Sequence, residues 1–170
     1  MYRLVIVYLA AIVAANLLVT TFGPAVSIVN AFVLIALDLT SRDRLHEAWA
    51  GRGLVWRMAA LIVAGSALSY ALNRSAGPIA LASCAAFGAS ATADALAYHL
   101  LRGRSWGVRA NGSNLLSAAV DSLVFPVLAF GWPPLWPIVI GQFLTKTIGG
   151  AAWSVLLRPG ANEQRSPASC

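Results

Sequence analysis

The chain has 170 residues, of which 59% are hydrophobic and only 11% are charged, and its mean hydropathy is +0.73. This composition excludes an ordinary soluble domain and predicts an all-α, polytopic membrane protein. Each bilayer span needs about 20 residues, so the chain has room for about six transmembrane helices with short loops. Two cysteines without metal-ligand or disulfide spacing give no reason to expect a metal or a cofactor.

The N-terminal part of the chain contains two apolar runs. Residues 4–22 form a first predicted span, in which Asn16 and Thr20 share one helical face. These two side chains either hydrogen-bond to a neighbouring helix or contact a ligand. The second run, residues 26–39, has only 14 uninterrupted apolar residues and carries Asp38 near its end. It is therefore predicted to be a short, extended or partly re-entrant span.

A polar segment and two further spans follow. Residues 40–53 hold two acidic residues beside three arginines and are predicted to form an amphipathic helix on the membrane surface. The third and fourth predicted spans cover residues 54–72 and 79–101, separated by a turn. Asp94 lies in the fourth span, about 10 Å inside the boundary at Arg102. It is either an interfacial partner of a loop arginine or a functional carboxylate.

The fifth predicted span, residues 108–130, contains Asp121 near its centre. An ionisable group at that depth is expensive and is therefore usually functional. Asn114, Ser117 and Asp121 are spaced i, i+3 and i+7, which places an amide, a hydroxyl and a carboxylate on one stripe. The stripe predicts a polar site within the membrane.

The sixth predicted span, residues 135–157, carries Gln142 and Lys146 on one face. Counted from the turn between the last two spans, Asp121 and Lys146 differ in depth by only about 3 Å. Each charge would cost several kcal/mol, on the order of 3 by insertion scales, if left unpaired in lipid. The two groups are therefore predicted either to form a structural ion pair or to share a polar ligand. Residues 1–157 are predicted to be one domain, followed by a flexible tail at 158–170.

Arginine placement predicts the orientation of the helices. In a six-span arrangement only Arg74 falls on one side, whereas all the other arginines fall on the opposite side. Because positive residues concentrate in cytoplasmic loops, both termini are predicted to be cytoplasmic. The arginines on that side are Arg3, Arg42, Arg44, Arg52, Arg57, Arg102, Arg104, Arg109, Arg158 and Arg165.

Four sequence features together resemble the VUT family of queuosine precursor transporters. They are DLTSR at 38–42, DALAY at 94–98, NGSNLLSAAVDSLVFPVLAF at 111–130, and the intramembrane Lys146. The resemblance covers nearly the whole chain. It implies a six-helix protein of the bacterial inner membrane, similar in architecture to the substrate-binding components of vitamin transporters. The implied solutes are 7-cyano-7-deazaguanine and 7-aminomethyl-7-deazaguanine, which serve tRNA modification.

The resemblance also implies a set of solute-binding positions, to which geometry adds Gln142. A deazaguanine presents two adjacent N–H donors that suit a carboxylate, and a carbonyl that suits an ammonium or amide donor. The predicted binding residues are Asp38, Asp94, Asn114, Asp121, Gln142 and Lys146, with Phe125, Phe143 and Trp153 as aromatic candidates beside the ring.

Three functions remain as alternatives at this stage. The first is a solute transporter that is not an enzyme, in contact with lipid and with a small 7-deazapurine and not with nucleic acid. The second is a substrate-binding subunit for another vitamin or nucleobase-like solute. It would need a separate energising module, because the chain has no ATP-binding P-loop. The third is an intramembrane enzyme in which Asp94 and Asp121 act as acid and base. A homo-oligomer is compatible with each.

Overall fold

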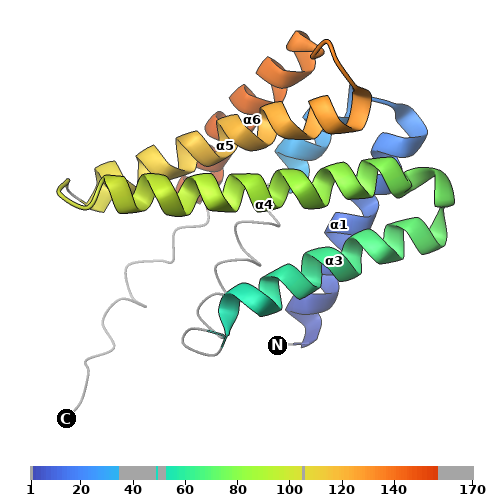
Figure 1. Ribbon diagram of the computed structural model, residues 1–170, viewed down its shortest axis with the longest axis horizontal. Helices are drawn as coiled ribbons and strands as arrows, with labels where there is room; N and C mark the ends of the chain where they lie inside the picture. The colour runs from blue at the N-terminus through green and yellow to red at the C-terminus, as the bar shows by residue number, and fades with distance from the viewer. Residues whose placement is uncertain (1, 35–48, 50–52, 105, 157–170) are drawn as a thin grey trace.

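The computed structural model describes residues 2–34, 49, 53–104 and 106–156 (Figure 1). Within these ranges all regular structure is helical, which confirms the predicted all-α class. Asp38, most of the polar segment at 40–53 and the tail at 158–170 lie outside the described residues. The helices are α1 (Tyr2–Phe22), a helical segment at residues 26–34, α3 (Leu54–Leu72), the short 3-10 helix η1 (Arg74–Ala76), α4 (Gly77–Leu100), α5 (Trp106–Phe130) and α6 (Trp136–Leu156).

Four helices of the described part of the chain are long and apolar enough to cross a membrane. The spans, judged by length and composition, are Val5–Phe22, Val55–Leu72, Arg74–Ala97 and Gly112–Phe130. The last helix, α6, is not among them, and it carries Gln142, Lys146 and two threonines within its apolar sequence. The structure therefore agrees with the predicted helix positions to within a few residues.

Helices α1 and α3 lie next to each other and run in the same direction. Near their N-terminal ends Tyr8 packs with Met58, and further along Asn16 Nδ2 donates a hydrogen bond to Ser69 Oγ at 3.1 Å. Parallel neighbours require the intervening chain to return to its starting end. The helical segment 26–34 begins this return beside α1, where Asn30 Nδ2 donates to the carbonyl of Ala15 at 3.2 Å.

A glycine sets how closely these parallel helices approach. A Cβ added at Gly65 of α3 would lie 2.7 Å from Cγ2 of Ile12 on α1. Real side chains do not tolerate such a distance, and Cγ2 of a β-branched residue cannot swing away as the end of a long chain can. Glycine is thus required at position 65 because the two backbones pass so close together.

Helices α3, α4 and α5 then follow one another with alternating direction. The turn between α3 and α4 is capped by Asn73, whose side chain accepts a hydrogen bond from the backbone N–H of Ser75 at 3.1 Å. Just beyond it, Pro78 occupies the first turn of α4, where a missing N–H costs nothing. Helices α4 and α5 lie side by side over most of their length (Figure 1).

Because the helices alternate in direction in this way, four of the five arginines whose side chains are described lie at one end of the bundle. Arg3 and Arg57 stand at the beginnings of α1 and α3, which share an end. Arg102 and Arg104 follow α4, which runs back to that end. Arg74 stands at the opposite end, between α3 and α4.

Trp49 gives an indication of how the polar segment meets the bundle. Its side chain is buried between Tyr8 and Met58, and the guanidinium of Arg57 lies 5.6 Å from the centre of its ring. The sequence predicted this tryptophan on a helix at the membrane surface. In the structure its side chain packs against α1 and α3 at their shared end, and the guanidinium beside the ring adds a cation–π attraction.

Candidate functional site

The hairpin of α5 and α6 brings two charged residues to one level in the bundle. Gly131, with φ of +89°, ends α5 in a conformation that favours glycine, and α6 begins at Trp136. Asp121 lies nine residues before the end of α5, and Lys146 lies ten residues after the start of α6. At a rise of 1.5 Å per residue these positions are about 14 and 15 Å from the hairpin end, near mid-bilayer.

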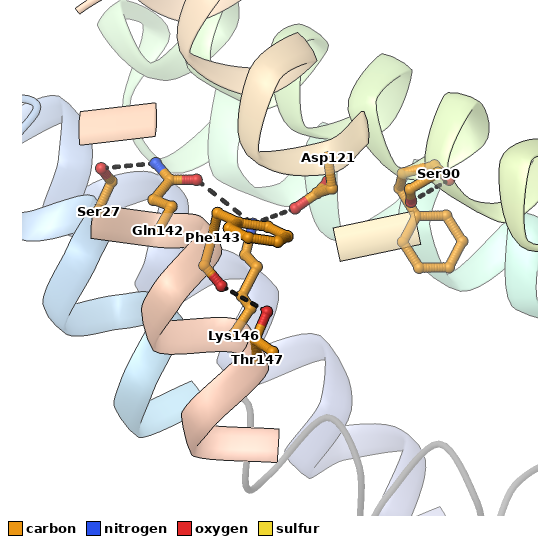
Figure 2. A network of polar contacts seen from close by, with 8 residues as sticks. Ser27, Ser90, Asp121, Gln142, Phe143, Lys146 and Thr147 are labelled. Carbon is orange, nitrogen blue, oxygen red and sulfur yellow. Dashed lines mark hydrogen bonds and ion pairs between the residues drawn. The ribbon is translucent and has the colours of Figure 1, made fainter. Parts of the chain in front are cut away.

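Lys146 and Asp121 form an ion pair across this hairpin (Figure 2). The ammonium Nζ donates to Oδ2 of the carboxylate, as their matched depth predicted. The Lys146 and Asp121 side chains remain 18% and 29% exposed. One side of the pair is therefore open, which distinguishes it from an ion pair sealed within a core.

The closed side of the pair is formed by Gln142, one helical turn before Lys146. Lys146 Nζ donates to Gln142 Oε1 at 3.3 Å, and Gln142 Nε2 donates to Ser27 Oγ at 2.8 Å. Ser27 belongs to the helical segment 26–34, and its hydroxyl donates in turn to the carbonyl of Pro24. Gln142 is only 2% exposed. The result is a continuous relay of hydrogen bonds from the N-terminal part of the chain to Asp121 (Figure 2).

Close packing of α6 on the segment 26–34 makes this relay geometrically feasible. A Cβ added at Gly141 would lie 2.6 Å from Cδ1 of Ile28, next in sequence to Ser27. The glycine therefore lets the two helices approach until a serine hydroxyl reaches the glutamine amide.

The ion pair retains unused hydrogen-bonding capacity. An ammonium has three N–H donors and a carboxylate has about four acceptor positions. Lys146 uses one donor on Asp121 and one on Gln142, while Oδ1 of Asp121 has no hydrogen-bond partner among the described residues. The open side of the pair thus offers both a free acceptor and a free donor.

Asp94 approaches the same region from α4. Helix α4 packs along α5, and Figure 2 draws Ser90 of α4 on the side of Asp121 that is away from Lys146. Asp94 follows Ser90 by four residues and therefore lies on the same face, one turn nearer the loop. Its Oδ1 is buried without a partner, and none of the described arginines pairs with it. An interfacial ion pair, one of the two roles that the sequence allowed for Asp94, is therefore absent from the part of the chain that the structure covers.

Comparison with known proteins now places the chain in a family. Residues 4–157 match the family described as "Putative vitamin uptake transporter". The chain belongs to this family. Comparisons with curated proteins and with solved structures gave no match. Membership, together with the apolar helices, identifies the chain as a multi-pass membrane protein of a transporter family, whose cargo is a small-molecule solute.

Two polar residues that the sequence analysis considered for a solute site, Asn114 and Asn16, do not join the relay from Ser27 to Asp121. Asn114 is exposed and makes no hydrogen bond to a described residue, although it shares a stripe of α5 with Asp121. Asn16 instead serves the contact of α1 with α3, which is the first of the two roles that its position allowed. Its partner Ser69 is fully buried. A stripe on a helix therefore does not by itself show which polar groups join one site.

Two of the three aromatic candidates, Phe125 on α5 and Phe143 on α6, lie on the helices that carry the ion pair. Phe143 lies against the head of Lys146 in the view of Figure 2. Phe125 makes an edge-to-face contact with Phe130, with ring centres 5.9 Å apart and planes at 83°. The side chain of Trp153 lies outside the described residues. Phe143 also precedes Lys146 by three residues on α6, so the two side chains lie on neighbouring parts of the helix surface.

Ser122 is a polar group that the sequence did not single out. Its side chain is fully buried, and its Oγ has no hydrogen-bond partner among the described atoms. It follows Asp121 directly on α5. A serine among apolar residues carries no signal in the sequence, because membrane helices commonly contain serines that bond to their own backbone.

Proposed function

We propose that this transporter carries a 7-deazaguanine precursor of queuosine across the bacterial inner membrane and binds it at the pair of Asp121 and Lys146. The observation that carries the proposal is an ion pair near mid-bilayer that is sealed by Gln142 on one side and open on the other. A pair with free acceptor and donor positions on its open side is suited to a small polar solute.

The chemistry of a deazaguanine complements these free positions. Its ring N–H and exocyclic amine lie side by side and can both donate to the carboxylate of Asp121. Its carbonyl, on the neighbouring edge, accepts from the ammonium of Lys146. Phe143 supplies an aromatic surface for the flat ring. Asp94, with its buried and unpaired Oδ1, offers a further acceptor one turn away on α4.

The arginine distribution supports an orientation for this uptake protein. Four described arginines stand at the end of the bundle where α1 and α3 begin, and Arg74 stands at the other end. By the positive-inside rule the former end faces the cytoplasm, which places both termini there in a six-span chain. The α5–α6 turn then lies on the outer side, from which solute arrives.

An uptake experiment tests the proposal directly. A bacterial strain that cannot make the precursor and lacks its own importer is supplied with 7-cyano-7-deazaguanine, with or without the chain. We expect queuosine to appear in tRNA only when the chain is present, and the solute to be recovered unchanged in mass from membrane vesicles. Absence of queuosine with the protein present in the membrane would contradict the proposed substrate. A chemically altered solute would favour an intramembrane enzyme.

Reconstitution separates a transporter from a binding subunit. Purified protein in lipid vesicles should accumulate the labelled precursor by itself under an imposed ion gradient. If the protein binds the precursor saturably but moves none, the chain is a binding component that needs a separate energising module.

A further inference from the structure

Ser27 lies at the far end of the relay from Asp121, and the sequence did not single it out. It is 5% exposed and its Oγ accepts the hydrogen bond of Gln142 Nε2 at 2.8 Å. The two residues are 115 positions apart in the chain. This contact is therefore the point where the N-terminal part of the bundle reaches the ion pair.

Gln142 is too deeply buried to contact a solute. It is 2% exposed, its Nε2 is engaged by Ser27, and its Oε1 is engaged by Lys146. Although the sequence predicted Gln142 as a binding residue, an amide held in this way acts through Lys146.

The direction of each hydrogen bond in the relay is fixed by chemistry. An ammonium has only donors, so Gln142 must turn its oxygen, not its nitrogen, toward Lys146. The amide nitrogen then needs an acceptor, and Ser27 provides one because its own hydrogen is donated to the carbonyl of Pro24. Without this hydroxyl, the amide loses the partner that holds its oxygen against the ammonium.

We propose that Ser27 and Gln142 are positioning residues that hold the ammonium of Lys146 in place beside Asp121. The consequence for solute affinity rests on the proposed function, whereas the orientation of the ammonium does not. Ser27 thus makes the helical segment 26–34 part of the site without touching the solute.

Lys146 is the chain's one lysine, which permits a direct measurement of the ammonium. Protein labelled with 15N at lysine Nζ gives one side-chain signal in lipid nanodiscs, without any solute. We expect Ser27→Ala to shift that signal and to broaden it, because the ammonium loses a fixed neighbour. Ser27→Thr keeps the hydroxyl and should keep the wild-type signal. Gln142→Met removes the relay from its other side and should also shift it.

The matched control is Ser69→Ala. Ser69 is equally buried, accepts from a side-chain amide, Nδ2 of Asn16, and joins two helices away from the pair. This variant should leave the lysine signal unchanged. An unchanged signal in Ser27→Ala and in Gln142→Met would overturn the positioning role, whatever the outcome for transport.

Uptake gives the second measurement. Ser27→Ala should raise the solute concentration for half-maximal uptake by about tenfold, with the maximal rate retained, because the ammonium is no longer held in place before the solute binds. In a Gln142→Met background the same change should have no further effect, because the relay is already broken. Independent, additive effects would overturn the relay. If the lysine signal shifts in the Ser27 and Gln142 variants but the wild type takes up no solute, the proposed function is refuted and the positioning role stands.

Discussion

Replacing Asp121 with asparagine is the most informative change at the proposed site. Asp121→Asn keeps the size and shape of the side chain, but it removes the charge and converts one acceptor oxygen into a donor. Lys146 then loses its anion and retains only the 3.3 Å contact with Gln142. A deazaguanine that approaches the open side meets one acceptor and one donor where it requires two acceptors.

The expected loss of affinity follows from these contacts. A hydrogen bond to a charged group contributes about 1.5–3 kcal/mol, and an unpaired buried donor costs about 1–3 kcal/mol. In Asp121→Asn, one hydrogen bond from the solute to the side chain loses its charge assistance. At the second position a solute N–H donor faces the new amide N–H donor. We therefore expect a loss of about 3–4 kcal/mol, which corresponds to a decrease in affinity of roughly 100-fold to 1,000-fold. Saturable uptake should disappear at micromolar solute.

The assay must separate binding from folding. Initial rates are measured in vesicles that contain equal amounts of folded protein, for the wild type, Asp121→Asn, Lys146→Ala and the double variant Asp121→Asn/Lys146→Met. Each single variant leaves one charge without its partner and should lose both uptake and thermal stability. The double variant removes both charges and should recover stability, since buried pairs can be exchanged for uncharged groups.

Uptake by the double variant decides between the two roles of the pair. If Asp121 and Lys146 contact the solute, this protein is stable and inactive. Uptake near the wild-type rate would show that the pair only neutralises two charges, and it would refute the binding role assigned here.

Three further predictions test Asp94, the orientation and the packing of α1 on α3. Asp94→Ala should lower uptake at least tenfold with normal membrane insertion, because its unpaired Oδ1 lacks a hydrogen-bond donor that a bound solute can bring; normal uptake would reduce Asp94 to a packing residue. Reporter fusions should place both termini in the cytoplasm and the turn at Arg74 outside, and a cytoplasmic Arg74 would exclude the predicted orientation. Gly65→Ala should lower the free energy of unfolding by about 1–3 kcal/mol through its clash with Ile12, whereas Gly88→Ala, whose Cβ meets nothing within 4 Å, should not.

The pairing of Asp121 with Lys146 could be predicted because a short turn fixes the register of two neighbouring helices. Counting residues from Gly131 gives the depth of each charge, and the high cost of an unpaired charge in lipid supplies the reason to pair. The same reasoning gave the all-α class and most helix ends, because long apolar runs separated by glycine, proline and arginine leave few alternatives. The depth of a residue along a helix follows directly from its position in the sequence.

The partners of Ser27 and Asn114 could not be predicted, because they depend on how the helices are rotated and which helices are neighbours. Ser27 reaches Gln142 across 115 residues, and nothing in either segment encodes that encounter. Asn114 shares a stripe with Asp121 yet is exposed, so residues on one stripe need not be equally covered by neighbouring helices. Gln142 was identified correctly as polar and near Lys146, but its burial shows that proximity to a charge and access to a solute are separate properties.

The ion pair also has a place in a transport cycle of the proposed kind. An empty carrier must cross between its two open states without leaving single charges in lipid, each of which costs about 3 kcal/mol by insertion scales and more in an isolated helix. With no solute, Lys146 and Asp121 satisfy each other. A solute that donates to the carboxylate and accepts from the ammonium can replace this mutual contact, whereas one that does only half of this leaves a charge unpaired. Selection for solutes with both features thus follows from the cost of separating the pair, and Gln142 keeps the ammonium in place while the separation occurs.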